Sequence, residues 1–175
     1  MKKFELTAES KINIFGKKLF RIKALISFGD VEEGETGGWI EKEENLEQSS
    51  GNAWVYGNAE VYGNARVYGN AWVYGNAEVY GNAEVSGNAR VSGNAEVSGN
   101  ADYTTIHGFG TQFRTTTFFQ CEDKQIRVSC GCFLGTIPEF REQVKNTREG
   151  KIAEEYLMIA DLMEKHFVKE KESGE

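Results

Sequence analysis

Residues 51–56 read Gly-Asn-Ala-Trp-Val-Tyr, and this six-residue phrase recurs nine times without insertion up to residue 104. A fixed short period of this kind is the signature of a solenoid. Within each copy, Ala-x-Val-Tyr/Ser predicts a short strand with Ala and Val on one face. Gly and Asn tolerate left-handed backbone angles, so each Gly-Asn pair predicts a corner. The repeat therefore predicts a stack of short parallel strands around a core of valine and alanine.

The phrase Val-Tyr-Gly-Asn-Ala-x resembles the hexapeptide-repeat family, in which an aliphatic residue and a small residue recur at fixed places. The resemblance implies a left-handed parallel β-helix with triangular coils of three phrases, or eighteen residues. We therefore expect a mainly β protein, with a left-handed β-helix of about three coils over residues 51–104.

An eighteen-residue coil assigns the outward side chains to three faces, on which residues eighteen apart are about 4.8 Å from each other. The first face is aromatic, with Trp54, Trp72 and Arg90 beside Tyr56, Tyr74 and Ser92. The second is acidic, with Glu60, Glu78 and Glu96 beside Tyr62, Tyr80 and Ser98. The third is mixed, with Arg66, Glu84 and Asp102 beside Tyr68, Ser86 and Thr104.

Residues 1–50 are expected to form an N-terminal β cap, because an uncovered β-helix end exposes unpaired backbone groups. A strand is predicted at residues 4–7, followed by a hairpin of residues 12–15 and 19–22. Ile40 and Leu46 are six residues apart, which indicates a degenerate phrase leading into the repeat. A small loop at residues 47–50 then breaks the register.

Residues 105–175 are expected to form a C-terminal α+β module after a glycine-rich exit at residues 105–110. Strands at 115–121 and 125–130 are predicted to pair as a hairpin. Thr136, Pro138 and Glu139 match a helix start, which predicts a first helix to about Asn146. A second helix is predicted over residues 152–169 from its apolar spacing.

The charge and composition of the chain argue against several classes of function. The net charge is −7, which lacks the basic footprint of a general nucleic-acid binder, so direct DNA binding is not expected. The net negative charge would favour binding of a basic partner, or it serves only to keep the protein soluble. No apolar run approaches the roughly 18 residues of a membrane span. The N-terminus lacks the apolar segment of a secretion signal, and three cysteines are not a disulfide framework, so we expect a cytoplasmic protein.

The aromatic face is the first candidate binding site, formed by Trp54, Tyr56, Trp72 and Tyr74. At about 150–250 Å² each, these side chains exceed the largest apolar patch usual on a monomer, roughly 300–600 Å². A second subunit, the protein's own end modules, or a partner protein or planar ligand would cover them. Arg90 is expected to contact Trp72 by a cation–π interaction or to pair with a phosphate.

The acidic face is the second candidate, because Glu60, Glu78 and Glu96 stack like charges at strand spacing. It is either a site for a basic partner or cation, or a solvated edge whose repulsion prevents fibre growth. A zinc site at the cysteines with His107 is the weaker interpretation, because the spacing lacks the two-residue knuckle. Buried free thiols are favoured for Cys121, Cys130 and Cys132, and no metal or cofactor is expected.

A second resemblance concerns function. Gly-Gly-Trp-Ile-Glu at residues 37–41, the repeat, and the run at residues 128–137 resemble uncharacterised proteins of bacteriophages and prophages. This implies a mobile-element context and the cytosol of the host cell. We expect a non-enzymatic, self-associating accessory protein that inhibits or sequesters a host-defence component, either a protein or a nucleotide signal. For a nucleotide, Arg66 or Arg90 would bind phosphate.

Two alternatives stay open. The resemblance to hexapeptide-repeat proteins implies an enzyme alternative, because many members of that family are trimeric acyltransferases with a catalytic histidine in the groove between neighbouring β-helices. The repeat itself has no histidine, and His107, just past the last coil, is the position that would serve. The other alternative is a structural spacer between two functional ends.

Overall fold

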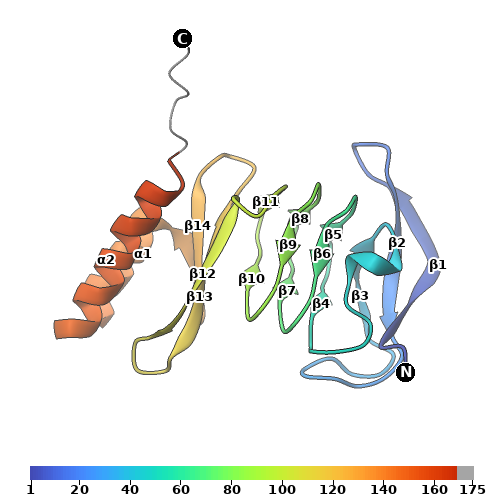
Figure 1. The fold of residues 1–175 in the computed structure, drawn as a ribbon, viewed down its shortest axis with the longest axis horizontal. Coiled ribbons are helices and arrows are strands. Elements are labelled where there is room, and N and C mark those ends of the chain that lie inside the picture. The colour runs from blue at the N-terminus through green and yellow to red at the C-terminus, as the bar shows by residue number, and fades with distance from the viewer. Residues whose placement is uncertain (169–175) are drawn as a thin grey trace, which may run out of the picture.

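The computed structural model describes residues 1–168 of the chain. It is an elongated molecule in which an N-terminal cap, a solenoid and a C-terminal module follow one another in chain order (Figure 1). The predicted mainly β fold is confirmed, with a solenoid of about three coils between two end units.

Eight two-residue strands form the solenoid, one for each of the first eight phrases. They are β4 (Trp54–Val55), β5 (Glu60–Val61), β6 (Arg66–Val67), β7 (Trp72–Val73), β8 (Glu78–Val79), β9 (Glu84–Val85), β10 (Arg90–Val91) and β11 (Glu96–Val97). They pair in parallel along three faces, in the orders β4-β7-β10, β5-β8-β11 and β6-β9. Partners are eighteen residues apart, as Trp54↔Trp72 and Arg90↔Trp72 illustrate, so the predicted coil length is confirmed. The left-handed winding stays an expectation of the resemblance.

The solenoid core contains the valine of each of these phrases, and every one is fully buried. At the corners, glycine alone adopts the left-handed conformation, as at Gly75 with φ of 72°. The following asparagine instead joins a ladder along the corner. The Asn64 amide donates to Asn82 at 3.2 Å, and Asn70 donates to Asn88 at 3.3 Å. Asparagine therefore stabilises the stacking of coils, a role beyond the turn formation expected of it.

The N-terminal cap is an antiparallel hairpin of β1 (Phe4–Ile12) and β2 (Lys18–Ala24), followed by β3 (Thr36–Ile40). β1 is one strand with a register shift, whereas two separate strands were predicted for this stretch. β3 pairs in parallel with β5, so the cap and the acidic face share a six-stranded sheet, β1-β2-β3-β5-β8-β11.

The predicted lead-in phrase is confirmed. Ile40 stacks on Val61, and Leu46 stacks on Val67 after the short 3-10 turn η1 (Glu43–Asn45). Asn45 is buried and donates to the carbonyl oxygen of Ala65 at 2.8 Å, which ties this phrase to the next coil.

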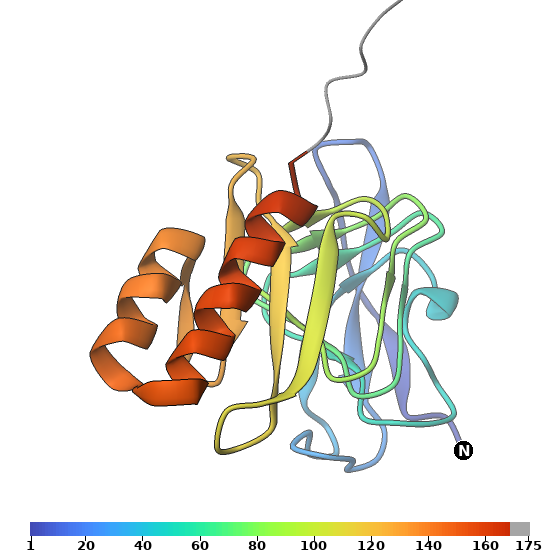
Figure 2. The same ribbon diagram turned by 60° about the vertical axis from the view of Figure 1, so that its left-hand side comes forward.

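The C-terminal module contains a four-stranded antiparallel sheet, in the order β12 (Tyr103–Phe109), β13 (Arg114–Gln120), β14 (Ile126–Cys130) and β15 (Phe133–Thr136). The predicted hairpin of β13 and β14 is present. The segment expected to be an irregular exit is instead an edge strand, β12. The helices α1 (Ile137–Thr147) and α2 (Gly150–His166) lie side by side against one face of the sheet (Figure 2). Lys169, the predicted end of the second helix, lies outside the described residues.

The ninth phrase does not join the solenoid, contrary to expectation. Asp102 is not stacked on Glu84; its carboxylate accepts hydrogen bonds from the Ser98 hydroxyl and the Gly99 backbone, which closes a turn. Tyr103 then begins β12, and its hydroxyl donates to the carbonyl oxygen of Glu84. The replacement of valine by Tyr103 marks the end of the solenoid.

The sheet of the C-terminal module has two buried faces. In β13, Phe119 packs into the solenoid core, whereas its neighbour Phe118 packs against the helices. An isolated antiparallel bridge joins Ala95 to Cys121, so the module closes the last coil directly. This arrangement places the β12–β13 loop and the β13–β14 turn next to the outer faces of the solenoid.

Candidate functional site

The aromatic face is only partly exposed. Trp54 has 0% of its surface accessible, because the N-terminal cap covers it. Its ring lies edge-on against Phe28 at 5.4 Å and against Phe4 at 6.1 Å. The expectation of a four-residue exposed aromatic patch is therefore wrong for Trp54. Of the three predicted covers, the protein's own end module is the one observed at this residue.

The outer part of this face is an arginine–aromatic cluster made of Tyr56, Trp72, Tyr74 and Arg90, all half-buried. The guanidinium carbon of Arg90 lies 4.1 Å from the Trp72 ring centroid, so the expected cation–π contact is confirmed. The Tyr56 ring lies 5.2 Å from Trp72, and burial raises the pKa of Tyr56 to about 12. Arg90 donates to the carbonyl oxygen of Asn70 at 2.9 Å. Within residues 1–168, Arg90 makes no salt bridge.

A shallow groove of about 360 Å³ extends this cluster onto the C-terminal module. Arg90 forms one wall, and His107, Phe113, Arg114 and Thr115 come from β12, β13 and the loop between them. Phe113 is 65% exposed and has a left-handed backbone with φ of 50°. His107 Nδ1 lies 3.3 Å from the Thr115 hydroxyl. Two arginines and an exposed aromatic ring thus meet on an otherwise acidic protein.

Sequence reasoning missed Phe113 and Arg114, because the pairing of β12 with β13 brings them beside a residue of the last coil. Arg66 is not part of this cluster. It lies on β6, on the mixed face, where its guanidinium is 5.9 Å from the Tyr68 ring centroid. The structure therefore brings together Trp72, Tyr74 and Arg90 but leaves Arg66 on another face.

The acidic face follows the predicted ladder of Glu60, Glu78 and Glu96. Both outer members are paired with cations from the end modules. Lys11 lies 2.6 Å from the Glu60 carboxylate, and Lys124 lies 2.6 Å from that of Glu96. The middle member, Glu78, has no salt bridge to any described residue. Lysines from the two end modules thus reduce the repulsion among the stacked glutamate side chains.

Tyrosines cover the remaining part of the acidic face. Tyr62 and Tyr80 stack with ring centroids 5.2 Å apart and planes 5° apart, and Phe15 from the β1–β2 turn lies 6.2 Å from both. The Tyr62 hydroxyl donates to Glu78 at 2.9 Å, and the Tyr80 hydroxyl donates to Glu96 at 2.7 Å. Because most of its polar groups already have partners, this face is a weaker binding candidate than the arginine–aromatic cluster.

The pKa of Glu78 is raised, first by its burial and then by the charges of Glu60, Glu96 and Glu122. The folded protein therefore favours the protonated form of Glu78. The contribution of this group to the free energy of unfolding is fully present below its unfolded pKa and is lost as the pH rises through its folded pKa. Glu78→Gln mimics the protonated form and still accepts the tyrosine hydrogen bond. After allowing for solvent screening, we expect it to stabilise the protein at pH 7 by about 0.5 kcal/mol, or roughly 1–2 °C in Tm.

The matched control is Glu84→Gln, because the Tyr68 hydroxyl also donates to Glu84, at 3.3 Å, while Arg66 occupies the neighbouring strand. This control is expected to give no gain in Tm at pH 7. Thermal unfolding measured between pH 4 and pH 8 should show the Glu78→Gln gain shrinking toward low pH. A Glu78→Gln protein that is less stable than the wild type at pH 7 contradicts the assignment.

The cysteines are free thiols in three different environments. Cys121 is buried, and burial raises the pKa of its thiol to about 11. Cys130 is half-buried and accepts a hydrogen bond from the Thr116 hydroxyl at 3.2 Å. Cys132 is exposed, so the prediction of a buried thiol is wrong at this position. The tight β14–β15 turn explains the difference, because it carries Cys132 away from the sheet.

A family model described as the YdcK beta solenoid repeat matches residues 59–75. No curated protein matches the chain. None of the described helices is long and apolar enough to cross a membrane. The match covers one coil, from β5 to β7, and together with the three parallel ladders it supports a β-solenoid repeat fold.

Proposed function

We propose that this protein is a non-enzymatic binding protein whose arginine–aromatic cluster sequesters a planar, anionic ligand of the nucleotide class. The observation that carries the proposal is the stacking of the Arg90 guanidinium on Trp72 at 4.1 Å, with no carboxylate paired to it among the described residues. The resemblance to phage and prophage proteins implies a mobile-element context, in which such a ligand would be a nucleotide signal of host defence in the host cytosol.

The chemistry of the cluster supports this ligand class. Aromatic rings and guanidinium planes are the surfaces on which bases stack in single-stranded and mononucleotide sites. Arginine also donates two parallel hydrogen bonds to a phosphate. Arg114, which lines the same groove as Arg90, supplies a second positive charge for a ligand with more than one phosphate. Phe113 offers a further ring at the groove edge.

Self-association through the aromatic face is a competing use of the same residues, and it has lost part of its support because the cap covers Trp54. Tyr56, Trp72 and Tyr74 are the aromatic residues left to form a contact between subunits. If they do so, Trp72→Ala converts an oligomer to a monomer in light scattering. A ligand site on the same residues predicts no change in mass for this variant.

The proposal is tested by calorimetric titration of the purified protein with purine and pyrimidine nucleotides and the matching nucleosides. We expect saturable binding of a nucleotide, with the nucleoside at least about tenfold weaker because it lacks the charge-assisted bonds to arginine. Trp72→Ala and Arg90→Gln should each weaken binding by about tenfold or more, since a stacked base contributes roughly 1–3 kcal/mol.

Arg66→Gln is the control, because it removes an exposed arginine from a different face and should leave the affinity within about twofold. Circular dichroism checks that all three variants are folded. If no nucleotide binds the wild type, or if binding survives both Trp72→Ala and Arg90→Gln, the proposed function is wrong. Turnover of acetyl-CoA that disappears in His107→Ala would instead favour the acyltransferase alternative.

A further inference from the structure

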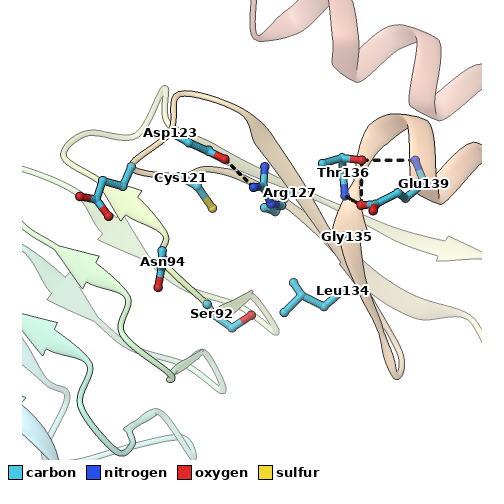
Figure 3. A pocket seen from close by; sticks show the side chains of 11 residues that line it. Ser92, Asn94, Cys121, Asp123, Arg127, Leu134, Gly135, Thr136 and Glu139 are labelled. Carbon is cyan, nitrogen blue, oxygen red and sulfur yellow. Dashed lines mark hydrogen bonds and ion pairs between the residues drawn. The ribbon is translucent and has the colours of Figure 1, made fainter.

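A second cleft, of about 780 Å³, lies where the C-terminal module meets the last coil (Figure 3). One wall is the corner after β10, which contains Ser92. A second wall is the turn after β13, and a third is β15 with the first residues of α1. The cleft is separate from the arginine–aromatic cluster, whose residues do not line it.

Two of the residues that line this cleft each carry a buried polar atom with no hydrogen-bond partner among the described residues, namely Ser92 Oγ and Arg127 Nη1. Ser92 is 1% exposed, and Figure 3 shows its hydroxyl oxygen pointing toward the side of the cleft that carries Leu134. A buried polar group without a partner costs free energy, and most such groups in native proteins are satisfied by protein, water or ligand. These two atoms therefore favour a ligand that accepts hydrogen bonds.

Two carboxylates near Arg127, those of Asp123 and Glu139, already have hydrogen-bond partners, and the contact with Asp123 orients the guanidinium. Arg127 Nη2 donates to Asp123 at 2.6 Å, which leaves Nη1 free (Figure 3). Glu139 is engaged in the helix cap, where its carboxylate accepts from the Thr136 backbone at 2.7 Å and from the Thr136 hydroxyl at 2.8 Å. Hydrogen bonds from Thr136 lower the pKa of Glu139, so it stays ionised.

The charges in the cleft select against a simple anion. Among the described residues that line it, Arg127 is the one cation, whereas Glu122, Asp123 and Glu139 are carboxylates. An inorganic anion would meet net negative charge there, because three carboxylates and one guanidinium line the cleft. A zwitterion avoids this cost, since its carboxylate accepts from Arg127 and Ser92 while its ammonium group faces the acidic side. Leu134, which is about half exposed, adds an apolar wall.

We propose that this cleft binds a small zwitterion of the free α-amino acid class, with an apolar side chain directed at Leu134. The carboxylate accepts hydrogen bonds from Ser92 Oγ and Arg127 Nη1, and the ammonium group lies near Glu122. This site is independent of the nucleotide cluster, so each can fail without the other.

The test is calorimetric titration of the full-length protein with leucine, leucinamide, N-acetylleucine and inorganic phosphate. Leucine should bind with one site per chain, and the derivatives without the carboxylate or the ammonium group should bind at least about tenfold more weakly. Ser92→Ala and Arg127→Gln should each weaken leucine binding by about tenfold or more. Ser86→Ala, at the same phrase position on another face, should leave binding unchanged.

A stability measurement without ligand separates binding from folding. Since Ser92 Oγ has no partner in the free protein, Ser92→Ala should keep or raise Tm by roughly 1–3 °C while losing the shift caused by leucine. Three results would overturn the proposal. They are the absence of leucine binding up to about 10 mM, leucine binding that survives both variants, and phosphate binding that is lost in Arg127→Gln.

Discussion

Trp54→Ala is expected to lower the free energy of unfolding by about 3–5 kcal/mol, the usual cost of truncating a buried tryptophan. The side chain is fully buried between the first coil and the cap, in edge-on contact with Phe4 and Phe28. Its loss opens a cavity between the cap and the first coil. Urea unfolding measures the effect, and the Tm should fall by roughly 6–20 °C.

Trp72→Ala is the matched control, because the tryptophan at the same phrase position one coil later is only half-buried, and its truncation should cost about 1 kcal/mol. Trp54→Phe refines the test. The indole Nε1 of Trp54 is buried without a partner, so phenylalanine retains most of the packing and removes an unsatisfied donor. Equal losses for Trp54→Ala and Trp72→Ala would show that the cap does not cover Trp54 in solution.

The second large effect is expected at the corner glycines. Gly75 has φ of 72°, and a Cβ there would lie 2.9 Å from the backbone nitrogen of Gly93 in the next coil. Gly87 has a similar φ of 64° but no neighbour within 4 Å. Gly87→Ala should therefore cost about 1–2 kcal/mol from backbone strain alone. Gly75→Ala should cost about 2–4 kcal/mol, because the coils must also separate.

Gly99→Ala completes this series, since Gly99 has neither a left-handed φ nor a close neighbour, and it should be nearly neutral. Chemical denaturation of the three variants measures the ranking. Equal costs at Gly75 and Gly87 would mean that the coils do not stack as closely as the structure requires.

The solenoid could be predicted in detail because its register depends on a short repeat. When every phrase is six residues long, one coil length assigns the outward positions of the first eight phrases, including the pairs Trp72↔Arg90 and Glu60↔Glu78. The start of the first helix was also predictable, because Thr136 and Glu139 form a capping box through local contacts. Such features depend on residues that are close in sequence or related by the period.

The contacts made by the end modules could not be predicted in this way. Nothing in the phrase around Trp54 distinguishes it from that around Trp72; the difference arises because β1 and β2 fold over the first coil. The same holds for Arg90 and Arg114, which meet only after β12 pairs with β13. One feature of the sequence does mark where the chain leaves the solenoid, namely the substitution of valine by Tyr103.

In the solenoid, residues eighteen apart in the sequence are neighbours on adjacent strands, and residues twelve apart are not. Oxidative disulfide formation tests it, in protein in which the exposed Cys132 is replaced by serine. Arg66 and Glu84 pair on adjacent parallel strands, about 4.8 Å apart, which is within the range that a disulfide spans. The same spacing creates the contact between Trp72 and Arg90, so the test also bears on the proposed site.

We expect Arg66→Cys/Glu84→Cys to form an intramolecular disulfide, detected by mass after alkylation of the remaining thiols. The matched pair Arg66→Cys/Glu78→Cys, twelve residues apart and on two different faces, should remain reduced under the same conditions. Crosslinking of the twelve-residue pair, or of neither pair, would contradict the eighteen-residue coil.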